Sequence, residues 1–293
     1  MGGKEAASAR YIFTSLSPVT RTLFPEADDP VLEYLEEEGQ SIEPTFYLPI
    51  IPLALVNGAD GIGTGWSTNI PQHNPREVVD NIKNMMYERP YVQMHPWYKG
   101  YTGTIEQNQG KYLVTGKYNV IDDDEVEITE LPIGKWTRDY KTFLEDLVQK
   151  ELVDDIREYH QENRVHFIIK VPNLDKIERR EGGIVKFFKL QGSLSESNQV
   201  LFNDKGQIYR YKAEEDIMKE WFGIRSTLYE TRKAYILAKL KKEYETLVNK
   251  VRFIRAVIEE TVKIKKVKRK DIVKQLKDQG FLTMAELNEI QKD

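Results

Sequence analysis

The chain has 293 residues, of which 40% are hydrophobic and 31% charged, so it can bury a core and form two or three structural units. It contains no cysteine, which excludes a disulfide framework and a thiolate metal site, and no apolar run is long enough to span a membrane. The formal net charge of -4 is unusual for a nucleic-acid-binding protein, which usually carries a basic patch.

The charged residues are unevenly distributed along the chain. Acidic residues cluster at 36–38, 122–125 and 154–155, whereas positive charge gathers near Lys4, Arg10 and Arg21 and again at 263–270. Because an acidic protein can still hold a phosphate backbone locally, the net charge does not exclude a nucleic-acid partner.

Arg10 and Tyr11 are the first pair of residues that could take part in a chemical reaction. A tyrosine oxygen is a suitable attacking and leaving group for reversible phosphodiester cleavage, and the guanidinium of Arg10 can contact two phosphate oxygens at once. The chain has 16 tyrosines, however, so a packing or surface role for Tyr11 remains an alternative on these residues alone.

Residues 50–71 combine an apolar run with a glycine-rich run. Residues 50–56 predict a buried strand, and the glycines at 58, 61, 63 and 65 then allow a neighbour to come close to the backbone. Ile62 lies among these glycines. It is either a core residue beside an ordinary turn or an apolar wedge of the kind that DNA-bending proteins insert between base steps. The glycine spacing matches neither nucleotide-binding fingerprint.

Residues 76–88 are predicted to form a helix, with Asn74 as its N-cap and Pro75 in its first turn. Short strands are then expected at 102–107, 111–121, 125–131 and 165–171, with a helix at 138–150 between the last two, which indicates an α+β domain.

Candidate metal ligands are sparse in this part. Asp122 and Asp124 form an Asp-x-Asp pattern, which we interpret as a solvated hairpin turn between strands, with a metal site as the alternative. The four histidines, His73, His95, His160 and His166, have no metal-binding spacing such as HExxH.

Residues 213–261 predict one long helix, which would reach roughly 70 Å at about 1.5 Å per residue. Six apolar residues recur on it at spacings of four and three and form a heptad seam: Leu240, Tyr244, Leu247, Val251, Ile254 and Ile258. The seam fits either a coiled-coil arm or an ordinary bundle helix. A last helix is expected at 270–279, ending at Gly280.

Several of these segments together resemble one family. ARYIF at 9–13, IIPLALVNGADGIGTGWSTNIP at 50–71, HPWYKG at 95–100, GTIE at 103–106 and EITELP at 127–132 are similar to the breakage-reunion region of type IIA DNA topoisomerases, and WST at 66–68 favours the eukaryotic topoisomerase II branch. The resemblance covers essentially the whole chain and implies that the chain is a fragment of a larger protein.

The resemblance implies an α+β fold in which a mixed-strand tower domain is followed by a long coiled-coil helix. Residues 1–88 would be the end of the DNA-gate (winged-helix) region, 89–212 the tower domain, and 213–293 a helical arm leading towards a C-terminal dimer gate, with the chain stopping before the returning arm.

It also implies roles for single residues. Tyr11 would attack a DNA strand to leave a 5′-phosphotyrosyl link, Arg10 would stabilise the transition state, and Ile62 would intercalate and bend the gate duplex. Further DNA contacts would come from Asn57, Thr64 and Ser67 beside the wedge, where Trp66 is expected to pack in the core, and from Asn249, Lys250, Arg252 and Arg255 on the long helix. Taken alone, the charges on that helix are typical of a solvated face.

Cofactors and partners follow from the same resemblance. Mg²⁺ and ATP are expected for the full-length enzyme but on upstream domains, so this chain should bind neither, supply no metal ligands, and be inactive alone. The expected partners are double-stranded DNA, a second copy in a homodimer, and the upstream metal-binding and ATPase domains, in the nucleus and with no membrane. The alternative is a non-catalytic DNA-bending or dimerising module.

Overall fold

The computed structural model of the chain describes residues 7–283, 285 and 286. The chain divides into two compact units, residues 1–20 with 49–222 and residues 21–48 with 223–293. The fold is α+β as predicted, with antiparallel sheets and one long helix. The predicted domain boundaries at 88 and 212 follow a different division and stay a prediction. None of the helices described is long and apolar enough to cross a membrane.

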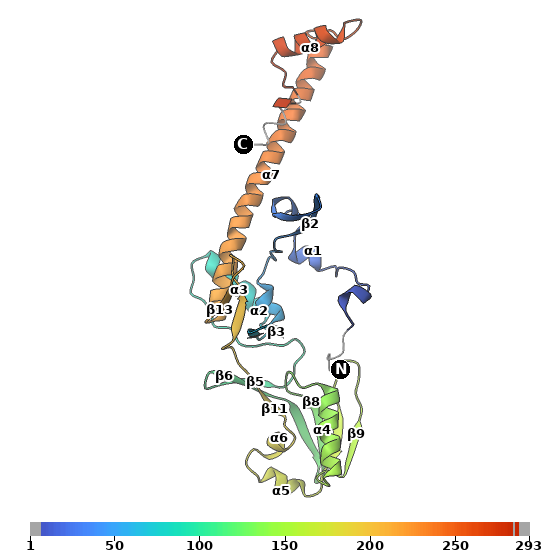
Figure 1. Cartoon of the computed structure of the whole chain (residues 1–293), viewed down its shortest axis with the longest axis vertical. Helices are drawn as coiled ribbons and strands as arrows, with labels where there is room; N and C mark the ends of the chain where they lie inside the picture. Colours follow the sequence, from blue (N-terminus) through green and yellow to red (C-terminus); the bar gives the residue numbers. More distant parts are fainter. Residues whose placement is uncertain (1–6, 284, 287–293) are drawn as a thin grey trace. The chain divides into compact units, whose positions relative to one another are not determined.

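The larger core of the first unit lies on a four-stranded antiparallel sheet. Its strands run in the order β7 (Lys117–Asp122), β8 (Glu125–Glu130), β10 (Phe167–Lys170) and β9 (Asp155–Glu158). Helix α4 (Thr137–Gln149) covers one face of this sheet (Figure 1), because Tyr140, Leu144 and Leu147 bury against Val126 and Phe167. The Tyr140 hydroxyl donates to the carbonyl of Phe188 at 2.7 Å.

A three-stranded sheet joins this core, with β11 (Gln191–Leu194), β6 (Lys111–Thr115) and β5 (Thr104–Asn108) in that order. Two short helices, α5 (Leu174–Glu178) and α6 (Gly183–Phe187), precede β11. The single strand predicted at 111–121 is wrong, because the chain breaks at Gly116 into β6 and β7. A Cβ at Gly116 would lie 2.3 Å from the carbonyl oxygen of Glu130, so the two sheets meet where only glycine fits.

The second core of the first unit surrounds a β-hairpin. It contains α2 (Leu53–Asn57), the hairpin strands β3 (Ala59–Ile62) and β4 (Ser67–Ile70), α3 (Pro75–Met86), the ribbon β12 (Gln199–Phe202) with β13 (Ile208–Tyr211), and the first residues of α7 (Glu214–Ile258). Leu55, Ile70, Val78 and Met218 are buried together there.

Two sequence predictions are decided in this core. The strand predicted at 50–56 is wrong, since Leu53–Asn57 is helical and follows Pro52, which occupies the N-cap position. A short apolar run has no periodicity that separates a strand from a buried helix. The helix after Asn74 is confirmed, because the Asn74 side chain accepts a hydrogen bond from the backbone N–H of Arg76 at 3.0 Å.

The second unit contains most of the long helix. Helix α7 confirms the long helix, and α8 (Arg269–Asp278) confirms the last one, with Gly280 at φ 67° just after its end. The unit also holds α1 (Thr20–Leu23) in part, a 3₁₀ turn at Asp29–Val31, and a hairpin of β1 (Tyr34–Glu37) with β2 (Gln40–Pro44). All six residues of the heptad seam are exposed, so the seam has no partner within the described residues.

Candidate functional site

Arg10 and Tyr11 lie on a single 3₁₀ turn, Ala9–Tyr11, closed by a hydrogen bond from the Tyr11 N–H to the Ser8 carbonyl at 2.9 Å. The Tyr11 side chain is 72% exposed. The guanidinium carbon of Arg10 lies 5.1 Å from the centre of the Tyr11 ring, which is within cation–π range. The structure therefore presents an accessible phenol hydroxyl with a permanent positive charge beside it.

Ile62 lies at the tip of the β3–β4 hairpin, where it pairs with Ser67 in the antiparallel ladder. Its side chain is 94% exposed, which rules out the alternative in which it points into the core. The tip is closed by a hydrogen bond from the Gly63 N–H to the Trp66 carbonyl at 2.8 Å. An isoleucine is thus held in solvent on a regular hairpin, whose ladder fixes the direction of its side chain.

The glycines around Ile62 serve two different purposes. At Gly58, φ is 68° and a Cβ would lie 2.6 Å from the Ile70 carbonyl oxygen, so this glycine is required by the fold itself. No atom lies within 4 Å of a Cβ at Gly61 or Gly65. Towards the tip, therefore, the missing side chains leave open space on the outside of the hairpin.

The polar residues predicted near the wedge lie on the same hairpin or directly before it. Asn57 ends α2, Thr64 lies in the tip and Ser67 begins β4, and all three are exposed. The prediction that Trp66 packs in the core is wrong, because it is 51% exposed at the tip. The four-residue turn places its ring beyond the last paired residues, outside the hydrophobic core.

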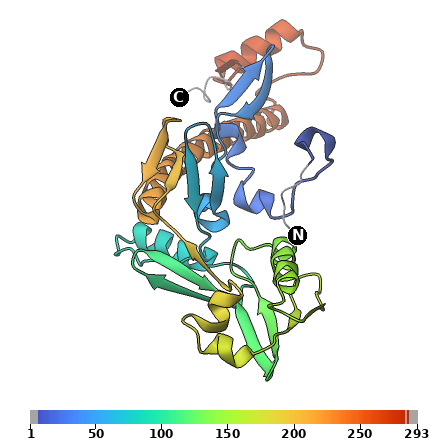
Figure 2. The same cartoon turned by 60° about the horizontal axis from the view of Figure 1, so that its bottom comes forward.

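Strand β4 of this hairpin is held by polar contacts to the chain around β12. Figure 2 shows the hairpin of β3 and β4 beside the hairpin of β12 and β13. The Asn69 N–H donates to the Asn198 carbonyl at 2.8 Å, and the Val200 N–H donates to Thr68 Oγ1 at 3.2 Å. The Asn198 side chain also donates to Ser67 Oγ at 2.9 Å. These bonds leave the tip free while fixing the strand that follows it.

The four predicted contact residues on α7 belong to the second unit and have different surroundings. The Asn249 side chain donates to the Leu282 carbonyl and accepts from its N–H, both at 3.1 Å. Arg252 donates to the carbonyls of Gln279 and Gly280 at 3.0 and 3.3 Å. Lys250 and Arg255 are exposed. Two of the four side chains therefore hold the chain after α8, and a nucleic-acid role for the set stays a prediction.

The acidic run at 122–125 forms the hairpin turn that we predicted, because Asp122 pairs with Glu125 where β7 turns into β8. Asp124 forms an ion pair with Lys170 at 3.2 Å, and Asp122 accepts from the N–H of Asp123 at 2.8 Å. A carboxylate already neutralised by a lysine on an exposed turn is a poor Mg²⁺ ligand, so this motif does not fit a metal site.

One group of titratable side chains could not be found from spacing. His73 lies beside Glu196 and Glu214, which come from distant parts of the sequence and are brought together only by the fold. The histidines alone gave no metal spacing, and the glutamates belong to no motif, so no sequence signal connected the three.

Comparison with known proteins assigns the chain to one family. The A-subunit family model of DNA gyrase/topoisomerase IV matches residues 1–292. The chain is 46% identical over 288 residues to DNA topoisomerase 2 of Arabidopsis thaliana, covering 96% of the chain and 20% of that protein. It is 44% identical over 297 residues to DNA topoisomerase 2 of Plasmodium falciparum, covering 100% of the chain and 21% of that protein. The chain thus spans about a fifth of the length of these relatives.

A solved structure agrees with the fold over the full chain. The crystal structure of the Plasmodium falciparum topoisomerase II DNA-binding, cleavage and re-ligation domain superimposes with a TM-score of 0.88 at 44% sequence identity. The match covers 100% of this chain and 40% of that one.

Proposed function

The chain belongs to the DNA gyrase/topoisomerase IV family, and from that premise we propose that it supplies the nucleophile and the DNA-bending hairpin of a type II DNA topoisomerase. The observation that carries the proposal is the exposed Ile62 at the tip of a regular hairpin, 94% accessible in a fold with two well-packed cores. An isoleucine in that position is best explained by a partner that buries it.

In the proposed reaction the Tyr11 oxygen forms a bond to a backbone phosphorus while the bond from that phosphorus to the 3′ oxygen breaks. The tyrosine proton passes to water or a base, and the released 3′ oxygen takes up a proton to become a hydroxyl group. The product is a 5′-phosphotyrosyl link, and the same steps in reverse reseal the strand. Arg10, held beside Tyr11, stabilises the charge that builds on the phosphate oxygens.

The hairpin acts on the shape of the DNA. Inserting Ile62 between base steps unstacks them and bends the duplex, and smooth bending of a 20–30 bp site costs about 1–6 kcal/mol. Burial of the isoleucine side chain returns about 1.5–3 kcal/mol of that cost. Thr64 and Ser67 at the hairpin tip, with Asn57 before the hairpin, contact the backbone of the bent duplex. Lys250 and Arg255, with Asn249 and Arg252, contribute contacts from the second unit.

The rest of the enzyme lies outside this chain. The full-length protein uses Mg²⁺ and ATP, which its metal-binding and ATPase domains bind, and it cuts DNA as a homodimer whose two tyrosines act on opposite strands. The Mg²⁺ supplies charge stabilisation at the cleaved phosphate, and the chain alone is inactive without the residues that hold it. The relatives are eukaryotic topoisomerases, which supports a nuclear location.

The role of Tyr11 is tested by trapping the covalent link. The chain is joined to the upstream domains of its parent protein and incubated with labelled duplex DNA and Mg²⁺, and the reaction is stopped with detergent. We expect a covalent protein–DNA adduct that disappears in Tyr11→Phe, because the phenyl ring has no attacking oxygen.

A matched control is available within the chain. Tyr87 is 65% exposed and lies under Arg89 at 5.1 Å, so it shares the exposure and the arginine contact of Tyr11. Tyr87→Phe should leave the adduct unchanged. An adduct of undiminished yield in Tyr11→Phe would instead favour a non-catalytic DNA-bending or dimerising module.

A further inference from the structure

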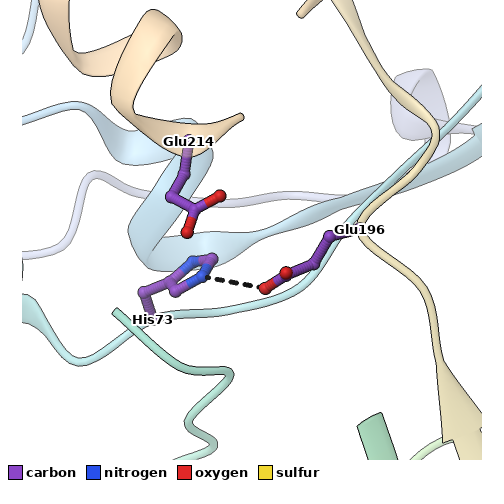
Figure 3. A group of neighbouring side chains, drawn as sticks. All are labelled: His73, Glu196 and Glu214. Carbon is purple, nitrogen blue, oxygen red and sulfur yellow. Dashed lines mark ion pairs between the residues drawn. The ribbon is translucent and has the colours of Figure 1, made fainter. Parts of the chain in front are cut away.

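Three titratable side chains that the proposed reaction does not use meet inside the first unit. His73 follows β4, Glu196 lies between β11 and β12, and Glu214 is the first residue of α7. One ligand atom of each lies within 4.8 Å of the other two, and Figure 3 shows the side chains pointing towards one another. His73 is 0% exposed, Glu214 is 6% exposed and the Glu196 side chain is 20% exposed.

The hydrogen bonds of His73 determine which of its nitrogens faces the glutamates. Nδ1 lies 3.3 Å from the carbonyl oxygen of Leu55, and since a carbonyl can only accept, Nδ1 carries the hydrogen and donates. In the neutral ring Nε2 then presents a lone pair. Metal-binding histidines usually have this arrangement, in which the far nitrogen donates to a backbone carbonyl and orients the ring.

Nε2 faces a second electron-pair donor. It lies 3.8 Å from Oε1 of Glu196, and within the described part of the chain neither atom has a hydrogen-bond partner. A buried lone pair that faces a buried carboxylate oxygen is unfavourable unless a positive charge lies between them.

No basic side chain of the described residues supplies that charge. The ion pairs found among them include one from His73 to Glu196 and none from a lysine or arginine to either glutamate. Two carboxylates and one oriented imidazole thus surround a position that favours a cation.

We propose that His73, Glu196 and Glu214 bind one divalent transition-metal cation, of which Zn²⁺ is the best-fitting example. Mg²⁺ and Ca²⁺ prefer oxygen ligands alone, whereas Zn²⁺ accepts imidazole nitrogen and carboxylate oxygen together. With bonds of about 2.0–2.2 Å, tetrahedral Zn²⁺ holds its ligands roughly 3.4 Å apart. The three ligand atoms lie within 4.8 Å of one another, and those of His73 and Glu196 are 3.8 Å apart, so the side chains close inward to hold the ion. A water molecule completes the fourth position.

The metal would stabilise the base of the hairpin that carries Ile62. It links the chain directly after β4 to the loop before β12 and to the start of α7, next to the bonds from Asn69 to Asn198 and from Val200 to Thr68. This site is separate from the Mg²⁺ of DNA cleavage, which we expect on another domain. Loss of the metal from this site should therefore lower the stability of the hairpin base and leave the chemistry at the cleaved phosphate unchanged.

The proposal is tested by metal titration of the 293-residue chain. The purified chain is stripped with EDTA and titrated with Zn²⁺ by calorimetry, and with Co²⁺ by visible absorption, which reports ligand geometry directly. We expect one Zn²⁺ per chain, a higher melting temperature with Zn²⁺, and no comparable response to Mg²⁺ or Ca²⁺. Glu196→Gln and His73→Gln should each weaken Zn²⁺ binding by tenfold or more, because each removes one of three ligands.

His166 provides the matched control. Its Nε2 lies 3.0 Å from Oε1 of Glu127, so it has a carboxylate neighbour, but it is not part of a three-ligand group among the described residues. His166→Gln should leave Zn²⁺ binding unchanged. Glu196 is partly exposed, and Glu196→Gln keeps the shape of its side chain. Circular dichroism is used to check that this variant folds. The test therefore remains decisive even where His73→Gln does not fold.

Three results would overturn the proposal. The first is wild-type chain that binds neither Zn²⁺ nor Co²⁺, which would mean that a proton on His73 supplies the positive charge. The second is equal Zn²⁺ affinity in wild type and Glu196→Gln. The third is loss of the Co²⁺ spectrum in His166→Gln but not in His73→Gln, which would place the ion elsewhere.

Discussion

At the scale of single residues, Tyr11 and Ile62 are both strongly exposed, at 72% and 94%. Tyr11 has the guanidinium of Arg10 beside its ring, and Ile62 extends from a hairpin tip with open space at Gly61 beside it. Neither placement stabilises the folded chain, since an exposed isoleucine forgoes about 1.5–3 kcal/mol of burial. Both are consistent with groups that are kept accessible for a partner.

Ile62→Ala should reduce DNA bending while leaving the fold intact, because the alanine methyl group is too short to separate stacked bases. Bending is measured by fluorescence energy transfer between dyes at the two ends of a duplex bound to the enzyme. Ile121, 52% exposed beside the β7–β8 turn, offers the control, and Ile121→Ala should bend DNA as wild type does. Equal bending by Ile62→Ala would remove the wedge from the mechanism.

Gly58→Ala should destabilise the chain by about 1–3 kcal/mol from backbone strain, since φ there is 68° and the new Cβ would meet the Ile70 carbonyl. Urea denaturation followed by circular dichroism measures the change. Gly61→Ala adds the same methyl group where no atom lies within 4 Å, so its free energy of unfolding should change by less than about 1 kcal/mol. Equal effects of the two substitutions would contradict the distinction drawn between these glycines.

At the scale of elements, a buried ion pair holds part of the second unit together. Arg225, on α7, donates to Asp28 at 2.6 Å, and Arg232, two turns further along, donates to the other oxygen of the same carboxylate at 3.0 Å. Asp28 and Arg225 are almost fully buried. One carboxylate therefore pairs with two arginines and fixes the segment before β1 against the long helix.

Asp28→Asn should destabilise this unit by about 3–5 kcal/mol, because it leaves Arg225 buried without its counter-ion. Chemical denaturation with a probe in the second unit, such as a dye on α7, measures the effect. Asp29→Asn breaks the neighbouring pair with Arg21 at 3.1 Å, which is solvent-exposed, and should cost no more than about 1 kcal/mol. A small effect of Asp28→Asn would show that water reaches Arg225.

Elements with a clear period could be predicted from the sequence, and short apolar ones could not. The α7 and α3 helices have long patterns and, for α3, an Asn-Pro start signal, so both were found within a few residues. The run at 50–56 has no alternation, and it became the helix α2 because Pro52 and the burial of Leu55 decide its conformation in three dimensions. The break at Gly116 was missed since it depends on contact with Glu130, far along the chain.

The residues of the candidate site likewise divide into those that sequence motifs reveal and those that they do not. Arg10, Tyr11 and Ile62 stand in continuous motifs, so a resemblance to known sequences singled them out as candidates. Trp66 was assigned to the core from its residue type alone, and the hairpin turn places it outside. The group of His73, Glu196 and Glu214 has no local pattern, because its members meet only through tertiary packing.

At the scale of the whole molecule, the exposed seam on α7 is a long apolar feature without a partner among the described residues. Its six side chains, from Leu240 to Ile258, follow one face of the helix over about five turns. Exposed apolar stripes of this kind mark interaction surfaces or cause aggregation. The seam is consistent with the predicted arm, in which a second helix covers it.

Because nothing described covers the seam, the isolated chain should self-associate through it at micromolar concentration. Replacing both Leu247 and Ile254 with lysine should weaken that association at least tenfold, since each loses an apolar contact worth about 1.5–3 kcal/mol. Sedimentation velocity over a concentration series measures it. The control changes an exposed lysine away from the seam, Lys239→Glu, and should associate as wild type does. Unchanged association in the seam variant would assign the contact to another surface.

The glycine break between β6 and β7 has a consequence for how the first unit folds. Residues 111–115 form β6 in the three-stranded sheet and residues 117–122 form β7 in the four-stranded sheet. Only Gly116 lies between the two strands. The β7–β8 pairing shifts register between Lys117 and Tyr118, directly after this glycine, so a bulge there can absorb a one-residue slip in the pairing of β5 with β6. The two sheets can therefore settle their registers separately, and a pairing error in one hairpin during folding need not pass to the other.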